Sequence, residues 1–385
     1  MTKFYFKIPI KTQIVIYQEF FEDFKNIKSS LINTVNKSYI IKNESINILC
    51  LINIFFSINS IRALFKDNLK ISYLVSYINL LSPKILITSI DNDKRFYQLK
   101  KYFFHIKFIS FQNGFRRKTH DFFENTDKHK NLLCDYFYAW GHKIASEYKK
   151  FIESKYIIFG SLKTYFVNND FFNKKKKLLI YISQTKETYY YIKKEYKFNI
   201  SAYFRYEKKL LRLLCHYCLA KNLTLTILNR TDSEKEIKYF KKILICRFKF
   251  IKIKDNFRIK KYKILGDYQV AISIMSSLGL ENFSLGRKTV FFPPATCKNI
   301  NPLNDLDPSW PGKTVNNDLF FFRNPNLQIM SCLLDNALKI STYDWKRRVA
   351  KFSKIISAPN KRKLDNLFQN FISEDQKIEN KIINN

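Results

Sequence analysis

The stretch GDYQVAISIMSSLGLENFSLG, residues 266–286, decides the fold that we predict for this chain. Its apolar run from Tyr268 to Met275 predicts a buried strand, and the residues 278–285 predict a helix. Ser276 and Ser277 join the two elements. Because the first turn of a helix offers unpaired N–H groups and the positive end of its dipole, such a strand–turn–helix unit can hold an anion.

Two explanations compete for the polar residues of this turn. Ser276 or Ser277 can serve simply as an N-cap, and Glu281, which we place in the first turn of the helix, suits the dipole there. Gly279 fits that explanation less well, because the 385 residues include only 7 glycines, where average usage of about 7% would give roughly 27. A chain so poor in glycine keeps it where other residues fit badly, so we favour ligand binding at this turn.

Outward from this segment, short apolar runs alternate with helical patterns in both halves of the chain. Strands are predicted in the first half at 84–91, 105–111, 135–140 and 156–159. They are predicted in the second half at 178–183, 223–228, 268–275 and 288–292, with a long helix at 206–221. Such alternation predicts parallel sheets with helices on both faces. We also expect a strand from Phe4 to Pro9 and burial of the uncharged stretch from Ile46 to Phe56.

The lysine run at residues 173–177 marks the predicted domain boundary, because it has no apolar residue to anchor it. The fold class that follows is α/β, with two Rossmann-like domains facing a cleft. They span residues 1–172 and 178–342, and residues 343–385 form a closing helix, which we expect to cross back to the first domain, and a frayed tail. Ligands of open parallel sheets bind at the carboxyl ends of the strands, so the strand-end loops are the candidate sites.

The formal net charge of +36, from 68 Lys and Arg against 32 Asp and Glu, has several explanations. Lys, Asn, Ile, Phe and Tyr are all frequent, which is typical of an AT-rich coding sequence. The charge is spread along the chain without a nucleic-acid-binding module, so we expect no nucleic-acid partner. A basic solvated surface explains it, and so does peripheral contact with anionic lipid headgroups, which needs no specific geometry.

The sequence favours a cytoplasmic protein without a metal site, in peripheral contact with the inner face of the membrane if with any. We expect no signal peptide, and the apolar stretch 46–64 is interrupted by Asn, Ser and Arg62, which favours a buried helix or strand over a membrane span. The 7 cysteines are scattered and odd in number, which favours reduced thiols. The Cys215-His216-Tyr217-Cys218 segment lies in a helical stretch and has no second ligand pair at zinc spacing.

The order of strand, Ser-Ser-x-Gly-x-Glu, helix, Gly-Arg-Lys and the strand VFF at 290–292 resembles the donor domain of GT-B glycosyltransferases. It is most similar to bacterial transferases of surface carbohydrate, such as capsule or lipopolysaccharide, and more distantly to CDP-glycerol glycerophosphotransferases. The resemblance implies that Ser276, Ser277 and Gly279 line a phosphate pocket and that Glu281 holds donor hydroxyl groups. It also implies catalysis without a bound metal, and no cofactor beyond the nucleotide-sugar co-substrate.

The first half carries the same resemblance in the segments FISFQNGFRRKTHDFF (108–123), DYFYAWG (135–141) and YIIFGSLK (156–163). It implies a cleft-lining, acceptor-side role for the turns that hold Gln112, Asn113, Gly114, Gly160 and Ser161. Asn113 stands where many relatives carry His, so a base at that position is missing here.

Other charged residues near the turns are candidates for the chemistry. His120 and Asp121 are candidate general bases. Arg116, in an Arg-Arg-Lys run, meets either the donor diphosphate, an acidic acceptor or only solvent. Arg230 follows a predicted strand, where it either contacts the diphosphate or pairs locally with Asp232 or Glu234.

These observations predict a glycosyltransferase that moves a sugar from a nucleotide-sugar donor to a surface polysaccharide or lipid-linked acceptor. A glycerophosphate-type transferase and a nucleotide-sugar epimerase are alternatives, because both would use the same phosphate pocket. A further alternative is a basic membrane- or nucleic-acid-binding protein that has kept a decayed transferase fold.

Overall fold

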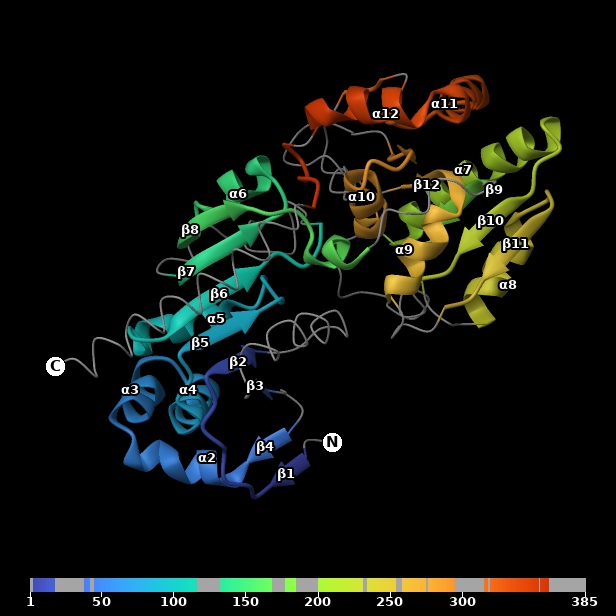
Figure 1. The fold of residues 1–385 in the computed structure, drawn as a ribbon. Coiled ribbons are helices and arrows are strands. Elements are labelled where there is room, and N and C mark those ends of the chain that lie inside the picture. Colours follow the sequence, from blue (N-terminus) through green and yellow to red (C-terminus); the bar gives the residue numbers. More distant parts are fainter. Residues whose placement is uncertain are drawn as a thin grey trace.

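The computed structural model describes residues 3–17, 38–41, 45–115, 132–167, 177–184, 200–230, 234–253, 258–274, 276–294, 315–317, 319–352 and 354–359. Within these residues the chain forms two large parallel sheets covered by helices, each in its own half of the sequence, and a small two-stranded one near the N-terminus (Figure 1). The predicted α/β class with two Rossmann-like domains is therefore confirmed. The lysine run at the predicted boundary lies outside the described residues, except for Lys177, which begins the second sheet.

The first sheet has six parallel strands in the order β3-β2-β5-β6-β7-β8. Its strands are β2 (Ile14–Tyr17), β3 (Ser38–Ile41), β5 (Ile85–Thr88), β6 (Lys107–Phe111), β7 (Leu132–Ala139) and β8 (Ile152–Ile158). The accompanying helices are α4 (Leu69–Leu81), α5 (Lys94–Leu99), η2 (Lys100–Tyr102), α6 (His142–Tyr148) and η4 (Leu162–Phe166). Every residue of β2 and β5 is buried, as is usual for parallel strands that are covered on both faces.

The second sheet has five parallel strands in the order β11-β10-β9-β12-β13. Its strands are β9 (Lys177–Ile182), β10 (Leu225–Leu228), β11 (Phe248–Ile251), β12 (Tyr268–Ser273) and β13 (Thr289–Phe291). Its helices are α7 (Ile200–Ala220), α8 (Glu234–Ile243), α9 (Arg258–Gly266), α10 (Ser277–Ser284) and α11 (Leu327–Lys339). The strand order reverses between β9 and β12, which is the point where doubly wound sheets bind ligands.

The first 70 residues depart from two of our predictions. The expected strand from Phe4 to Pro9 is limited to β1 (Lys3–Tyr5), which pairs with β4 (Ser45–Asn47). The expected burial of 46–56 is wrong: this stretch forms α2 (Ile48–Asn53) and η1 (Ile54–Phe56), and the side chains of Phe55 and Phe56 are 71% and 81% exposed. The absence of charge was the basis of that prediction, but only Asn47, Cys50 and Ile54 of this stretch are buried.

Helix α3 (Ile58–Lys66) follows at a sharp bend. Within the described ranges, no single helix has the length and apolar composition needed to cross a membrane. The pair Ile48–Phe56 and Ile58–Lys66 meets these criteria only together, and its two members are bent by 94°.

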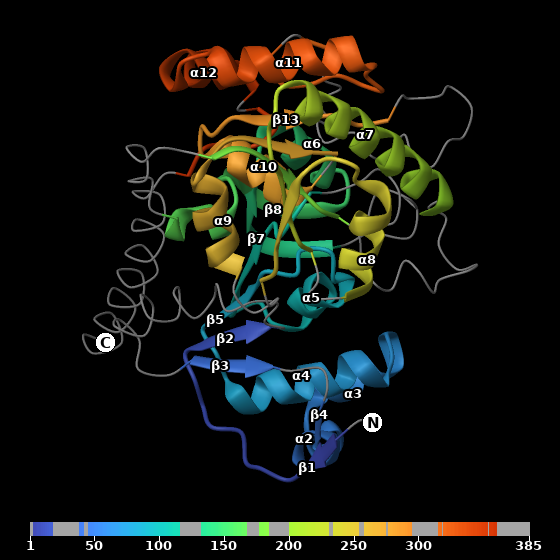
Figure 2. The same cartoon turned by 90° about the vertical axis from the view of Figure 1, so that its right-hand side faces the viewer.

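The C-terminal helices lie over the second domain, and the chain then returns to the first (Figure 2). In α12 (Thr342–Val349), Trp345 is fully buried and packs edge-on against Phe283 of α10, with ring centroids 6.3 Å apart. After η7 (Ala350–Phe352), the N–H of Ser357 donates to the carbonyl of Trp140, at 2.7 Å. The expected return to the first domain is therefore confirmed, but segment 354–358 makes it rather than the helix itself.

Glycine permits this return. Gly160 has a φ of +89°, in the left-handed region that favours glycine, and a Cβ there would lie 2.6 Å from the carbonyl oxygen of Ser357. A Cβ on Gly141 would lie 2.6 Å from the carbonyl oxygen of Lys354. Both glycines thus let the backbone of the C-terminal segment lie directly on the first domain.

We therefore predict that Gly160→Ala lowers the free energy of unfolding by about 1–3 kcal/mol or more, because strained backbone adds to a backbone clash. Gly266→Ala is the matched control, since Gly266 lies outside the left-handed region and the nearest atom to its new Cβ would be a side-chain atom, Nη2 of Arg287, at 3.3 Å. Urea unfolding of both variants measures the effect. Equal destabilisation by the two substitutions would contradict this explanation.

Candidate functional site

The candidate site lies where the strand order of the second sheet reverses. β9 and β12 are neighbouring parallel strands, so the residues after them, Ser183-Gln184 and Ser276-Ser277, leave the sheet at the same edge. Helix α10 begins there. Ser276 is its N-cap, because the Ser276 Oγ accepts a hydrogen bond from the N–H of Leu278, at 3.2 Å. The capping role that we considered is thus present, and its donor-binding role stays a prediction.

Gly279 has a packing role in this helix. A Cβ at this position would lie 3.0 Å from the Oγ of Ser273 and 3.2 Å from the Phe291 ring. Only glycine lets α10 approach the ends of β12 and β13 this closely. The scarcity of glycine correctly marked a constrained position, and the structure shows helix–sheet packing as one constraint, while contact with a ligand stays a prediction.

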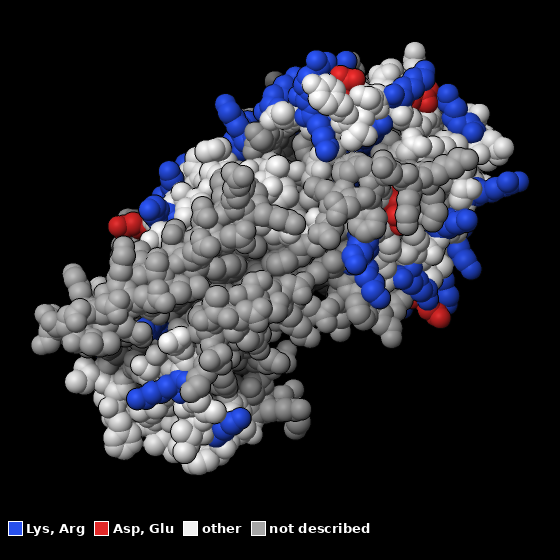
Figure 3. Space-filling model, in the orientation of Figure 1, with Lys and Arg blue, Asp and Glu red and all other residues white. Residues whose placement is uncertain are grey.

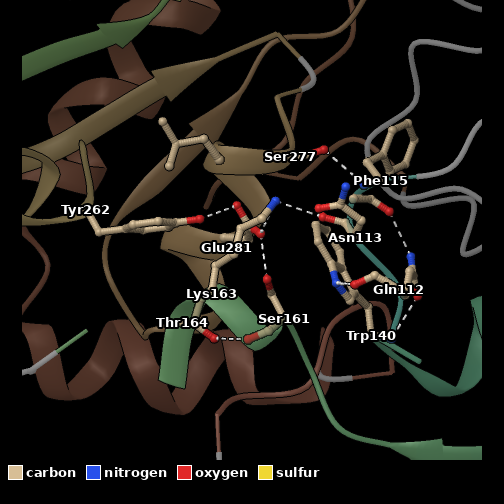
Figure 4. Close-up of polar contacts among 12 residues, drawn as sticks. Gln112, Asn113, Phe115, Trp140, Ser161, Lys163, Thr164, Tyr262, Ser277 and Glu281 are labelled. Carbon is tan, nitrogen blue, oxygen red and sulfur yellow. Dashed lines mark hydrogen bonds and ion pairs between the residues drawn. The ribbon is translucent and has the colours of Figure 1, made fainter. Parts of the chain in front are cut away.

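The position that we assigned to Glu281 within the helix was wrong, because Glu281 is the fifth residue of α10 and lies beyond its first turn. Its side chain is 2% exposed. Oε1 accepts a hydrogen bond of 2.5 Å from the Ser161 hydroxyl, and Oε2 accepts one of 2.6 Å from the Tyr262 hydroxyl (Figure 4). Since Ser161 belongs to the first domain, this carboxylate joins the two halves, a contact that the sequence analysis did not anticipate.

Lys163 completes this interdomain contact. Its Nζ lies 3.7 Å from Oε1 of Glu281 and donates a 2.9 Å hydrogen bond to the carbonyl of Asn113. A buried carboxylate is tolerated only when donors and an opposite charge compensate its lost hydration, and these three partners supply both. We missed Lys163 as a site residue, although it ends the segment YIIFGSLK, because a single lysine has no distinguishing pattern in a lysine-rich chain.

The predicted turn of the first domain is held in place by its own hydrogen bonds. The Gln112 side chain accepts from the N–H of Trp140, at 2.8 Å, and donates to the carbonyl of Gly114, at 2.9 Å. The indole N–H of Trp140 donates to the Gln112 carbonyl, at 3.0 Å. The N–H of Asn113 donates to the buried carboxylate of Asp91, at 2.9 Å.

This turn contacts the start of α10 directly. The N–H of Phe115 donates to the Oγ of Ser277, at 2.9 Å, and a Cβ on Gly114 would lie 3.3 Å from the same oxygen. The structure therefore brings together the strand-end turns at 112–114 and 276–277, which the sequence analysis had assigned to opposite sides of one cleft. Figure 4 shows the two turns facing each other beside Glu281.

Tyr262, which positions Glu281 from within the second domain, was also missed by the sequence analysis. Its carbonyl accepts a 2.6 Å hydrogen bond from the guanidinium of Arg287. Burial lowers the pKa of Arg287 to about 10. Tyr262 also packs with Leu285 and with Val167 of the first domain, so apolar contact surrounds the polar one.

Arg230 follows β10 and reaches toward the end of β9. Its Nη1 donates to the carbonyl of Gln184, at 3.2 Å, and its backbone N–H donates to the buried carboxylate of Glu236, at 3.0 Å. Lys261 adds a second cation here, with its Nζ 3.0 Å from the carbonyl of Asn229. The contact of Arg230 with the start of α8 is therefore made through its backbone, and the guanidinium lies at the carboxyl edge of the sheet.

The remaining predicted residues cannot be placed in this geometry. His120, Asp121, Arg116 and Asp232 lie outside the described residues. Among the residues that the structure does describe, no group of three or more His, Cys, Asp or Glu side chains is arranged to hold a metal ion.

Two Rossmann-like domains, joined by a C-terminal segment that crosses back and by contacts between their strand-end turns, define a GT-B-type fold. Solved structures with this fold are similar over nearly the whole chain. The wall teichoic acid polymerase TagF matches with a TM-score of 0.52 and 11% identity, over 96% of this chain and 91% of its own. A UDP-GlcNAc 2-epimerase from Neisseria meningitidis, solved bound to UDP-GlcNAc, matches with a TM-score of 0.53 and 11% identity, over 94% of this chain and 99% of its own.

The sequence also matches a family model, described as "putative O-antigen biosynthesis protein", over residues 109–375. This match covers more than half of the 385 residues, and the chain belongs to this family. A search of curated proteins by sequence finds no match. The resemblance to GT-B proteins of bacterial surface carbohydrate, with glycerophosphotransferases as more distant relatives, is thereby confirmed.

We predict that Ser161 and Glu281 are energetically coupled across the domains. In a double-mutant cycle of Ser161→Ala with Glu281→Gln, we expect a coupling energy of about 1–3 kcal/mol, because the two side chains share a buried hydrogen bond. The matched control is Ser161→Ala with Glu236→Gln, since Glu236 is equally buried but bonded instead to Ser183, at 2.5 Å. Chemical unfolding measures both cycles, and additivity in the first would refute the interdomain bond.

Proposed function

We propose that this protein is a glycosyltransferase that moves a sugar from a nucleotide-sugar donor to a surface polysaccharide or lipid-linked acceptor. The observation that carries the proposal is the meeting of strand-end turns from both domains at the point where the second sheet reverses its strand order. Membership in an O-antigen biosynthesis family and the GT-B-type fold support the same reaction class. The enzyme acts in the cytoplasm, without a resident metal or another cofactor.

The donor diphosphate is placed at the carboxyl edge of β9, β10 and β12. There the start of α10 offers N–H groups, and Arg230 and Lys261 supply positive charge beside Ser183 and Gln184. The leaving diphosphate gains negative charge as the sugar departs. Donors fixed in advance at this position stabilise that charge without having to reorganise, which lowers the barrier to transfer.

Deprotonation of the acceptor hydroxyl requires a base other than Asn113. The backbone N–H and carbonyl of Asn113 are bonded to Asp91 and Lys163, which fixes this residue near the interface. Its side-chain amide does not accept a proton at neutral pH. An amide can orient the acceptor by hydrogen bonding. His120 and Asp121, a few residues further along the chain, are the bases that we propose.

Glu281 has a structural role in this proposal in addition to donor recognition. Because Glu281 is 2% exposed and its oxygens contact Ser161 and Tyr262, we infer that donor hydroxyl groups reach it only when the contact with the first domain opens. Donor binding and domain contact therefore compete for the same carboxylate. Ser161 suits such a competition, because it holds Glu281 from the opposing domain by a single hydrogen bond that a donor hydroxyl group can replace.

The structural relatives suggest two other reactions on the same site. Transfer of glycerophosphate is suggested by the similarity to TagF, and epimerisation of a nucleotide sugar by the similarity to the Neisseria enzyme. Incubation with a labelled donor separates them, because a glycosyltransferase links the sugar to the acceptor, whereas an epimerase returns it still attached to its nucleotide. Binding that ignores nucleotide sugars and collapses with salt would instead support a non-enzymatic basic protein.

We predict that one of the UDP-, GDP-, CMP- or CDP-linked donors raises the melting temperature of the protein. At a concentration 100 times its Kd, a ligand adds about 2.7 kcal/mol to the free energy of unfolding, which a thermal-shift screen detects. Arg230→Ala should reduce the shift, because it removes a cation from the proposed diphosphate site.

The matched control is Arg247→Ala, an exposed arginine just before β11 at the opposite, amino edge of the same sheet. It should leave the donor-induced shift unchanged. If no donor shifts the melting temperature, or if the two arginine variants respond alike, the donor site is not where we place it.

A further inference from the structure

Exposed apolar side chains gather at the N-terminal end of the molecule. Within the described residues, the large apolar side chains that are exposed before residue 70 come from the first strand region and from α2, η1, α3 and the start of α4. They are Phe4, Phe6, Ile8, Ile10, Ile48, Ile52, Phe55, Phe56, Ile58, Phe65 and Leu69. A monomeric protein rarely leaves so many large apolar side chains in one region exposed unless they contact something.

The bend between α2 and α3 presents the most exposed of these side chains. Phe56, Ile58 and Phe65 are 81%, 84% and 84% exposed. We call the residues Ile48, Ile52, Phe55, Phe56, Ile58 and Phe65 the apolar corner. In Figures 1 and 2, α2 and α3 lie at the end of the molecule that is remote from the second domain.

Polar residues hold the corner in this orientation. Ser60, Ser72 and Ser76 are fully buried between these helices and α4. The Ser72 hydroxyl donates to the carbonyl of Ser60, at 2.7 Å, and the Ser76 hydroxyl donates to the carbonyl of Cys50, at 2.6 Å. The inward faces of α2, η1 and α3 are thus small, with Cys50, Ile54, Ser60 and Ala63 buried, while the phenylalanines of these elements face outward.

Two side-chain amides add to this polar attachment. Asn53 donates to the hydroxyl of Ser76, at 3.0 Å, and Asn79 donates to the hydroxyl of Ser57, at 2.8 Å. Ser57 is also the N-cap of α3, because its Oγ accepts from the N–H of Ser60, at 3.3 Å. The bend is thus fixed on both sides by hydrogen bonds, and the apolar side chains are held outward by the fold.

Among the described residues around the corner, every exposed charged side chain is positive. The described residues of segments 4–17 and 45–70 carry five exposed cations: Lys7, Lys11, Arg62, Lys66 and Lys70. The one carboxylate in these segments, Asp67, is paired with Lys101, at 2.9 Å, and accepts a hydrogen bond from Tyr102. In Figure 3 the described atoms at the lower end of the molecule are white and blue, without red.

We propose that the apolar corner docks on an anionic lipid bilayer, with Phe55, Phe56 and Ile58 entering the headgroup layer and the cations contacting lipid phosphates. A projecting apolar bend bordered by lysine and arginine has the composition of a surface that lies in a membrane interface. An acidic protein partner would need a hollow that matches the projecting bend between α2 and α3, whereas lipid chains adapt to its shape. This inference goes beyond the proposed transfer reaction, since docking needs neither donor nor acceptor.

The test is co-sedimentation of the full chain with vesicles of phosphatidylglycerol and phosphatidylethanolamine, without any donor. We expect the protein to sediment with these vesicles, and only weakly with phosphatidylcholine vesicles. The double variant Phe55→Ser/Phe56→Ser should weaken binding by at least about tenfold, because each phenylalanine side chain that enters an apolar layer contributes that much or more. Arg62→Ala/Lys66→Ala should reduce binding only to the anionic vesicles.

The matched control is Ile245→Ser/Tyr343→Ser, two apolar side chains of the second domain that are 65% and 75% exposed. It should bind vesicles as the unchanged protein does, and every variant should keep its melting temperature, because the substituted side chains are exposed. Failure of the unchanged protein to bind, or equal loss in the control, would overturn the proposal. A dimer in size-exclusion chromatography that Phe55→Ser/Phe56→Ser dissociates, with vesicle binding unchanged, would show that the corner joins two copies instead.

Discussion

The buried carboxylate of Glu281 is the interaction on which the relation between the two domains depends. A carboxyl group that is 2% exposed needs partners to compensate for its lost hydration, and part of that compensation comes from Ser161 and Lys163 of the other domain. While the contact is closed, α10 is held against the turn that carries Gln112 and Gly114. Loss of the contact with the first domain would leave Tyr262 as the remaining partner among the three, so the burial of Glu281 favours the contact between the domains.

The position of Glu281 links this contact to the proposed reaction. The carboxylate that joins the domains lies on the same helix whose first turn is proposed to receive the donor diphosphate. A donor that enters there changes the charge beside Glu281 and competes for its oxygens. The hydrogen bond across the domains and the proposed donor site would thus be electrostatically coupled. The C-terminal segment that returns to Trp140 adds a further contact between the domains.

The sheets could be predicted from the sequence because their strands are short apolar runs with polar ends. The predicted strand at 178–183 corresponds to β9 (Lys177–Ile182), and that at 268–275 to β12 (Tyr268–Ser273). β11 (Phe248–Ile251) was missed, because it is an edge strand, only partly buried, in a stretch where lysines alternate with apolar residues. Burial at 46–56 was mispredicted because apolar composition does not reveal which face of a helix meets the protein.

The candidate site was only partly predictable for a related reason. The turns at 112–114 and 276–277 follow strands of two different sheets, so sheet topology places each of them at the carboxyl edge of its own sheet, whereas their contact depends on how the domains are arranged. The partner of Glu281 lies 120 residues away in sequence, and nothing in the local pattern around Ser161 or Lys163 specifies that pairing. Gly279 was singled out for a correct reason, its rarity, but local sequence does not distinguish a glycine needed for packing from one needed for a ligand.

Hydrogen–deuterium exchange with and without the nucleotide-sugar donor tests the central claim most directly, because it reports on both domains at once. If the donor binds where β9 and β12 diverge, peptides that contain 183–184, 228–230 and 276–284 should gain protection. The peptide that contains Ser161 and Lys163 should change together with them. Protection confined to other regions, or a change at 276–284 without any change at 161–163, would contradict a donor site that is coupled to the domain contact.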